Sequence, residues 1–168
     1  MKNLRAHQHW LPVMLWMGFI FVMSTEVGTA SHTSRILGPL LKWLVPSISS
    51  EAIGIVHTLV RKGGHLTEYA VLALLGLRAV LRSQRGRNRA PSFFRSACLA
   101  ALISAAYATT DEFHQSFVPG RTASGYDVAI DTTGAVAALA AAAGWRRIRR
   151  PAGPKKSSSS ESKSHAGD

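Results

Sequence analysis

Four strongly apolar stretches, each bordered by charged residues, set the main constraint on how this chain can fold. They are residues 10–25, 70–81, 93–110 and 128–145. A helix that crosses a bilayer needs roughly 17 to 25 mostly apolar residues, so two of the stretches are long enough as they stand. The other two reach that length when neighbouring residues are included. The chain is therefore predicted to be an all-α membrane protein, a bundle of four transmembrane helices. The predicted spans are residues 8–26, 63–82, 93–111 and 127–145.

The distribution of Lys and Arg predicts how these spans are oriented. Basic residues concentrate in the loops that face the cytoplasm. If both termini are inside, the inner segments carry a net charge of +13 and the outer segments −2, which together account for the +11 of the chain. We therefore expect both the N- and the C-terminus in the cytoplasm. Topology and attraction to anionic membrane lipid explain the basic excess, so no nucleic-acid partner is expected.

The parts of the chain outside the spans are expected to connect them or to lack a fold. Residues 1–150 are predicted to form one transmembrane domain. Residues 151–168 are rich in Lys, Ser and Gly, and this composition predicts a disordered cytoplasmic tail. The N-terminal stretch has the basic start of a signal peptide but no convincing cleavage site, and we interpret it as a retained first helix. Residues 27–56 are interpreted as a long outer connection with a short interfacial helix around residues 40–44.

Most of the residues that carry chemistry gather in three short polar clusters at the ends of the predicted spans. One cluster opens the second span, one ends the third span, and one opens the fourth. Their members are Arg61, Lys62, His65, Glu68 and Tyr69, then Asp111, Glu112 and Gln115 followed by Arg121, then Asp127 and Asp131. Helical spacing places members of one cluster a turn apart on one face. By the predicted topology all three clusters meet in one outer-leaflet cleft, where unpaired charge is costly.

Three interpretations of this cleft stay open. As an acid–base site, it would use His65 as general base, Glu68 as its orienting partner, and Asp111 with Glu112 as an acid or metal site. As a metal site, it would join His65 and Glu68 to Asp111 or Glu112, although His-x-x-Glu does not specify a metal and the cofactor is unknown. As a structural feature, the polar side chains would bond one helix to another.

The remaining polar residues of the clusters are candidates for binding a substrate. These are Tyr69, Gln115, Arg121, Asp127 and Asp131. Arg121 has the geometry to clamp an anion such as phosphate. It is also the expected counter-ion of Asp127 or Asp131, while Lys62 or Arg61 is the expected counter-ion of Glu112.

The order and spacing of these residues resemble the VanZ-like family of small bacterial membrane proteins. The matching motifs are Lys62-x-x-His65-x-x-Glu68-Tyr69, then Asp111-Glu112-x-x-Gln115-x-Phe117-x-Pro119-x-Arg121, then Asp127-Val128 leading to Gly134. The resemblance covers about residues 11–145 and implies a multi-pass protein of the bacterial inner membrane. It also implies a link to resistance against the glycopeptide teicoplanin, which is associated with the founding member. Asp131 stands where the family pattern leads us to expect Asn.

Together these features suggest a polar pocket in the outer leaflet that binds or modifies an amphiphile of the cell envelope. A lipid-linked envelope precursor or a lipoglycopeptide is the expected partner besides membrane lipids, with glycopeptide tolerance as the phenotype. The alternative is a structural or accessory membrane protein whose polar cluster holds the bundle together. The sequence leaves open whether the protein is an enzyme and which oligomer it forms. A channel or transporter is disfavoured because no polar stripe crosses the membrane.

Overall fold

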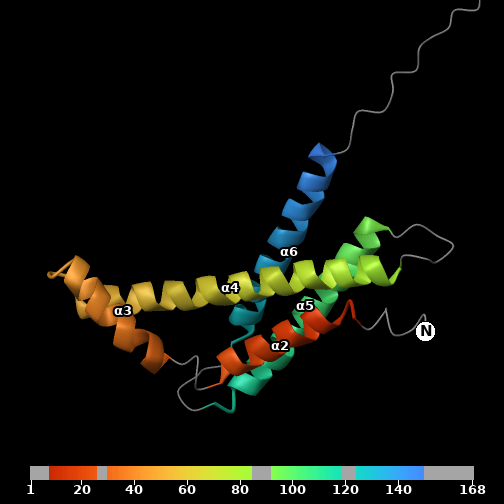
Figure 1. Ribbon diagram of the computed structural model, residues 1–168. Helices are drawn as coiled ribbons and strands as arrows, with labels where there is room; N and C mark the ends of the chain where they lie inside the picture. The colour runs from red at the N-terminus through yellow and green to blue at the C-terminus, as the bar shows by residue number, and fades with distance from the viewer. Residues whose placement is uncertain (1–7, 26–29, 85–91, 119–123, 150–168) are drawn as a thin grey trace, which may run out of the picture.

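The computed structural model describes residues 8–25, 30–84, 92–118 and 124–149, and every regular element in these ranges is an α-helix. Figure 1 shows their arrangement. The helices are α2 (Leu11–Ser24), α3 (Ala30–Leu44), α4 (Ser50–Ser83), α5 (Phe93–Gln115) and α6 (Gly125–Ile148). The prediction of an all-α protein is confirmed.

Three of the helices, α4, α5 and α6, are long and apolar enough to cross a membrane. Helix α2 is apolar but has 14 residues. At a rise of about 1.5 Å per residue it covers roughly 21 Å, less than the hydrocarbon core of about 30 Å. The helices thus support a multi-pass membrane protein, and α2 becomes a further span only with residues that flank it.

The region predicted as a long connection is helical over most of its described length. Helix α3 is 15 residues long, where the sequence predicted a short helix around residues 40–44. Helix α4 begins at Ser50, well before residue 63, because Ser49 caps it: the Ser49 hydroxyl accepts a hydrogen bond from the Ala52 backbone N–H at 3.1 Å. At 34 residues α4 is about 51 Å long, more than a bilayer core is thick. In Figure 1 α3 lies along the first part of α4, away from α5 and α6.

Helix α4 is the centre of the bundle and packs against α2, α5 and α6. One buried cluster joins α2, α4 and α5 around Ile20, Tyr69 and Leu72. A second joins α4, α5 and α6 around Leu77 and Leu139. Large apolar side chains on the outer surfaces of the helices are exposed, as expected of surfaces that contact lipid.

The closest approach of α4 and α6 occurs at a glycine. A Cβ atom built on Gly134 would overlap the carbonyl oxygen of Leu66 and lie 3.0 Å from the Leu66 carbonyl carbon. Small residues at helix interfaces allow such backbone contact in membrane proteins. This contact holds the first half of α6 against the middle of α4, where both helices carry polar side chains.

Candidate functional site

Polar residues of α4, α5 and α6 meet at the end of the bundle where α5 ends and α6 begins. A small cavity of about 10 Å³ is lined there by side chains from all three helices. Its polar lining residues are Arg61, Lys62, His65, Glu112, Asp127 and Asp131. This volume is about that needed for one water molecule, so a larger ligand must bind at the mouth or separate the helices.

His65 lies between two carboxylates at the side of this cavity. Its Nδ1 is 4.0 Å from Oε2 of Glu68, one turn away on α4, and 3.9 Å from Oδ2 of Asp131 on α6. The sequence predicted Glu68 as the orienting partner, and the structure adds Asp131 at the same range. Both distances exceed a hydrogen bond, but the bonds of a catalytic His are often long before a substrate binds.

Asp131 is the most deeply buried charged residue of the cleft, with 1% of its surface exposed. Neither of its carboxylate oxygens accepts a hydrogen bond from any residue that the structure describes. Asp111 is 3% exposed and Glu112 is 5% exposed. A buried carboxylate without hydrogen bonds is unfavourable, and such groups are found mainly where function requires them.

The mouth of the cleft is closed by an ion pair between α4 and α6. Lys62 Nζ lies 3.0 Å from Oδ1 of Asp127. Of the two counter-ions predicted for Glu112, Lys62 pairs with Asp127 instead, while Arg61 lines the same cavity as Glu112. Glu112 instead accepts a hydrogen bond from the backbone N–H of Ser124 at 2.8 Å, because Ser124 begins α6 directly beside it. Arg121, the predicted partner of Asp127 or Asp131, lies outside the described residues.

A second group of polar residues lies between α2 and α5 and does not line the cavity. Oδ2 of Asp111 accepts hydrogen bonds from the Ser24 hydroxyl at 2.8 Å and from Nε2 of Gln115 at 2.9 Å. The buried Tyr69 hydroxyl lies near this carboxylate and also near that of Asp131. Ser24 was not singled out from the sequence, and its signal is its position as a polar residue near the end of the first apolar stretch. The predicted site thus has a second part that does not line the cavity, and Tyr69 lies near the carboxylates of both parts.

No group of three or more His, Cys, Asp or Glu side chains within the described ranges converges with the spacing of a metal site. His65 lies about 4 Å from Glu68 and from Asp131. Asp111 accepts a hydrogen bond from Ser24 on α2. The metal interpretation, which joined Asp111 or Glu112 to His65, is not supported by a preformed ligand set in this part of the chain.

The apolar helices and the polar cleft at one end of them define a helical, multi-pass membrane protein that contacts lipid. A model of the VanZ/LLP1 family matches residues 9–146, which is most of the chain. The chain belongs to this family, as its motifs predicted. Comparisons with curated proteins and with solved structures gave no match.

Proposed function

We propose that the chain spans the bacterial inner membrane four times, with both termini in the cytoplasm, and that its polar cleft opens toward the outer leaflet. There the cleft binds, and through His65 modifies, an amphiphile of the cell envelope such as a lipid-linked precursor or a lipoglycopeptide. Glycopeptide tolerance is the expected phenotype. The observation that carries the proposal is the buried Asp131 carboxylate beside His65.

A purely structural contact between helices does not readily explain this pair. A hydrogen-bonded strut satisfies at least one of its oxygens, as Asp111 does at Oδ2 with Ser24 and Gln115, although Oδ1 of Asp111 accepts no hydrogen bond from the described residues. The carboxylate of Asp131 accepts none from the described residues, so it costs folding free energy that a merely structural residue would avoid. Carboxylates that are buried without hydrogen bonds concentrate at functional sites.

The cleft has the parts that an acid–base site needs. His65 stands between Glu68 and Asp131, and either carboxylate stabilises the imidazolium that forms when His65 accepts a proton. The cavity beside His65 has room for one water molecule. Arg61 lines the same cavity and is the cation that would bind a phosphate ester, because Lys62 is paired with Asp127 and the other charged lining residues are acidic. The apolar tail of such an amphiphile would remain in the membrane.

A structural role is the second candidate, and one observation favours it for part of the cluster. Asp111 and Gln115 bond to Ser24 and so tie α5 to α2. We therefore assign Asp111, Gln115 and the buried Tyr69 to positioning α2, and keep His65, Glu68, Asp131, Glu112, Asp127 and Lys62 for the site itself.

The experiment that separates the two roles compares His65→Ala with Ser24→Ala. In each strain the variant is the only copy of the protein. We measure its abundance in the membrane and the survival of the strain under lipoglycopeptide challenge. We expect His65→Ala to keep its abundance and lose protection, and Ser24→Ala to lose abundance. His57→Ala is the matched control, because His57 lies on the same helix but outside the cavity.

Normal survival of the His65→Ala strain at normal abundance would refute the proposed site. Loss of abundance in His65→Ala alone, with His57→Ala unaffected, would instead make the whole cluster structural.

A further inference from the structure

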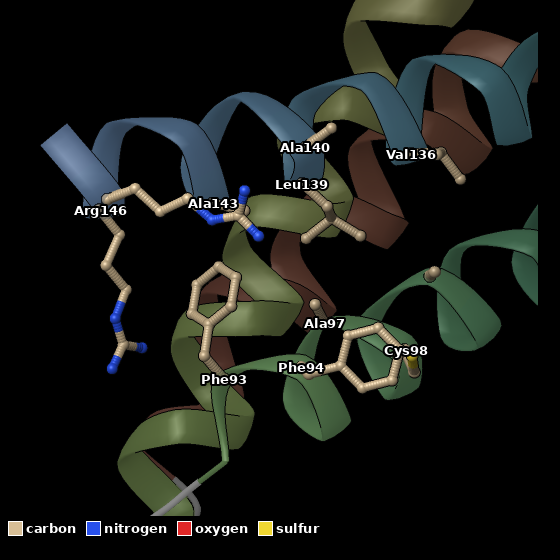
Figure 2. A pocket seen from close by; sticks show the side chains of 11 residues that line it. Phe93, Phe94, Ala97, Cys98, Val136, Leu139, Ala140, Ala143 and Arg146 are labelled. Carbon is tan, nitrogen blue, oxygen red and sulfur yellow. The ribbon is translucent and has the colours of Figure 1, made fainter.

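A second hollow lies near the opposite end of the bundle from the polar cleft. It is an apolar groove of about 530 Å³ between the start of α5 and the end of α6, shown in Figure 2. Phe93 and Phe94 flank it on α5, and Ala97 on α5 with Ala140 and Ala143 on α6 line it between them. Because these alanines are short, the two helices leave space between them that their own side chains do not fill.

The length of the groove matches one leaflet of a membrane. It runs along α6 from Val136 to Arg146, and the ten steps between these residues span about 15 Å at 1.5 Å per residue. This is about half of the roughly 30 Å hydrocarbon core of a bilayer. An extended acyl chain in the groove would therefore reach from the headgroup zone to the middle of the membrane.

One end of the groove is strongly basic. Arg146 and Arg147 both line it, and Cζ of Arg146 lies 4.9 Å from the centroid of the Phe93 ring. The acidic residues in the described part of the chain lie elsewhere, at the polar cleft or at the start of α4. They are Glu51, Glu68, Asp111, Glu112, Asp127 and Asp131. Within the described ranges, therefore, no carboxylate is positioned to neutralise the two guanidinium groups.

We propose that this groove binds an anionic glycerophospholipid, with one acyl chain along the alanines and the phosphate on Arg146 and Arg147. Guanidinium groups bind phosphate through paired, charge-assisted hydrogen bonds, and each basic residue near a membrane surface strengthens the binding of anionic lipid. A second copy of the chain seated in the groove is the alternative that the test below distinguishes. The site is separate from the polar cleft, and its test does not depend on the proposed function.

The test is native mass spectrometry of the full chain in a non-ionic detergent, with phosphatidylglycerol or phosphatidylcholine of identical acyl chains added. We expect the chain to retain one phosphatidylglycerol and to lose phosphatidylcholine. The double variant Arg146→Gln with Arg147→Gln should weaken phosphatidylglycerol retention on the order of tenfold or more. The double variant Arg82→Gln with Arg149→Gln is the charge-matched control, because it also removes two arginines and neither of them lines the groove.

A second pair of variants tests the groove itself. Ala140→Trp fills it, and Ala141→Trp adds the same volume on the same helix outside it. We expect only Ala140→Trp to lose the bound lipid while both variants remain monodisperse. If Ala140→Trp is not monodisperse, the smaller change Ala140→Leu takes its place with Ala141→Leu as control. Equal retention of the two lipids by the unmodified chain, equal retention by the filled and control variants, or a lipid-free dimer that the filling variant abolishes would each overturn the proposal.

Discussion

Lys62 on α4 and Asp127 on α6 form a 3.0 Å ion pair across the mouth of the polar cleft. Lys62 is held further by the ring of Tyr126, whose centroid lies 4.9 Å from Nζ. Two consecutive residues at the start of α6 thus fix one side chain of α4. The pair joins residues 65 positions apart in the sequence. It lies beside His65 and Asp131, so a ligand entering the cleft meets this pair at the mouth.

We predict that this ion pair contributes little to stability. The Lys62 side chain is 38% exposed, and exposed ion pairs are weakened by solvent. In a double-mutant cycle of Lys62→Met and Asp127→Asn, the coupling in the free energy of unfolding should be below about 1 kcal/mol. Thermal unfolding of the four proteins in detergent measures it. A coupling several times larger would show that the pair is effectively buried.

Gly134→Ala should separate α4 from α6. The added methyl group would overlap the backbone of Leu66, which cannot move as a flexible side chain does. We expect a loss of about 1–3 kcal/mol in the free energy of unfolding. Gly144→Ala on the same helix is the control, because a Cβ there meets nothing within 4 Å, and it should leave stability unchanged or raise it slightly. Equal melting temperatures for both variants would show that the backbone contact is absent.

Ser24→Ala should loosen α2. The change removes a buried hydroxyl that donates to Asp111 and accepts from Gln115, and it leaves both partners with fewer hydrogen bonds. We expect a loss of about 1–3 kcal/mol, seen as a lower melting temperature and lower membrane abundance. Thr109→Ala serves as the control, since the exposed Thr109 hydroxyl bonds only within its own helix, to Ala105. Equal melting temperatures for Ser24→Ala and Thr109→Ala would contradict the prediction.

Asp131→Asn should stabilise the protein while lowering its activity. Replacing a carboxyl group that is 1% exposed and accepts no hydrogen bond from the described residues with a neutral amide should raise the free energy of unfolding by on the order of 1 kcal/mol. Protection against lipoglycopeptide should fall, because His65 loses a carboxylate partner. Asp127→Asn, one turn earlier and paired with Lys62, should not stabilise. A stable Asp131→Asn protein with full protection would remove Asp131 from the site.

Much of the architecture was predictable because it depends on local composition. Apolar runs bordered by charge predicted the helices α5 and α6, whose described bounds contain those runs. The motifs from His65 to Asp127 predicted the family. The length of α4 was missed because residues 50–62 mix apolar and charged side chains, which obscures a helix that begins with the cap at Ser49.

The pairing of polar residues was predictable only in part. The predicted topology brought the clusters of α4, α5 and α6 together at one end of the bundle, and the cavity lining agrees. Spacing did not show that Asp111 turns toward α2, or that Lys62 meets Asp127 instead of Glu112. Those contacts depend on how each helix is rotated about its own axis.

The sequence by itself determined that this is a helical membrane protein of the VanZ/LLP1 family, and which end of α5 and of α6 carries polar residues. On α4 the polar residues lie near the middle, because the helix begins at Ser50. Helix formation and membrane partition follow from the hydrogen bonding and hydropathy of neighbouring residues, so both can be read along the chain. The tertiary structure decided which carboxylates accept hydrogen bonds. It also placed Asp131 beside His65, without a hydrogen bond from the described residues. The approach of Gly134 to the Leu66 backbone sets the spacing between α4 and α6, and contacts between distant helices of this kind are not encoded in any local pattern.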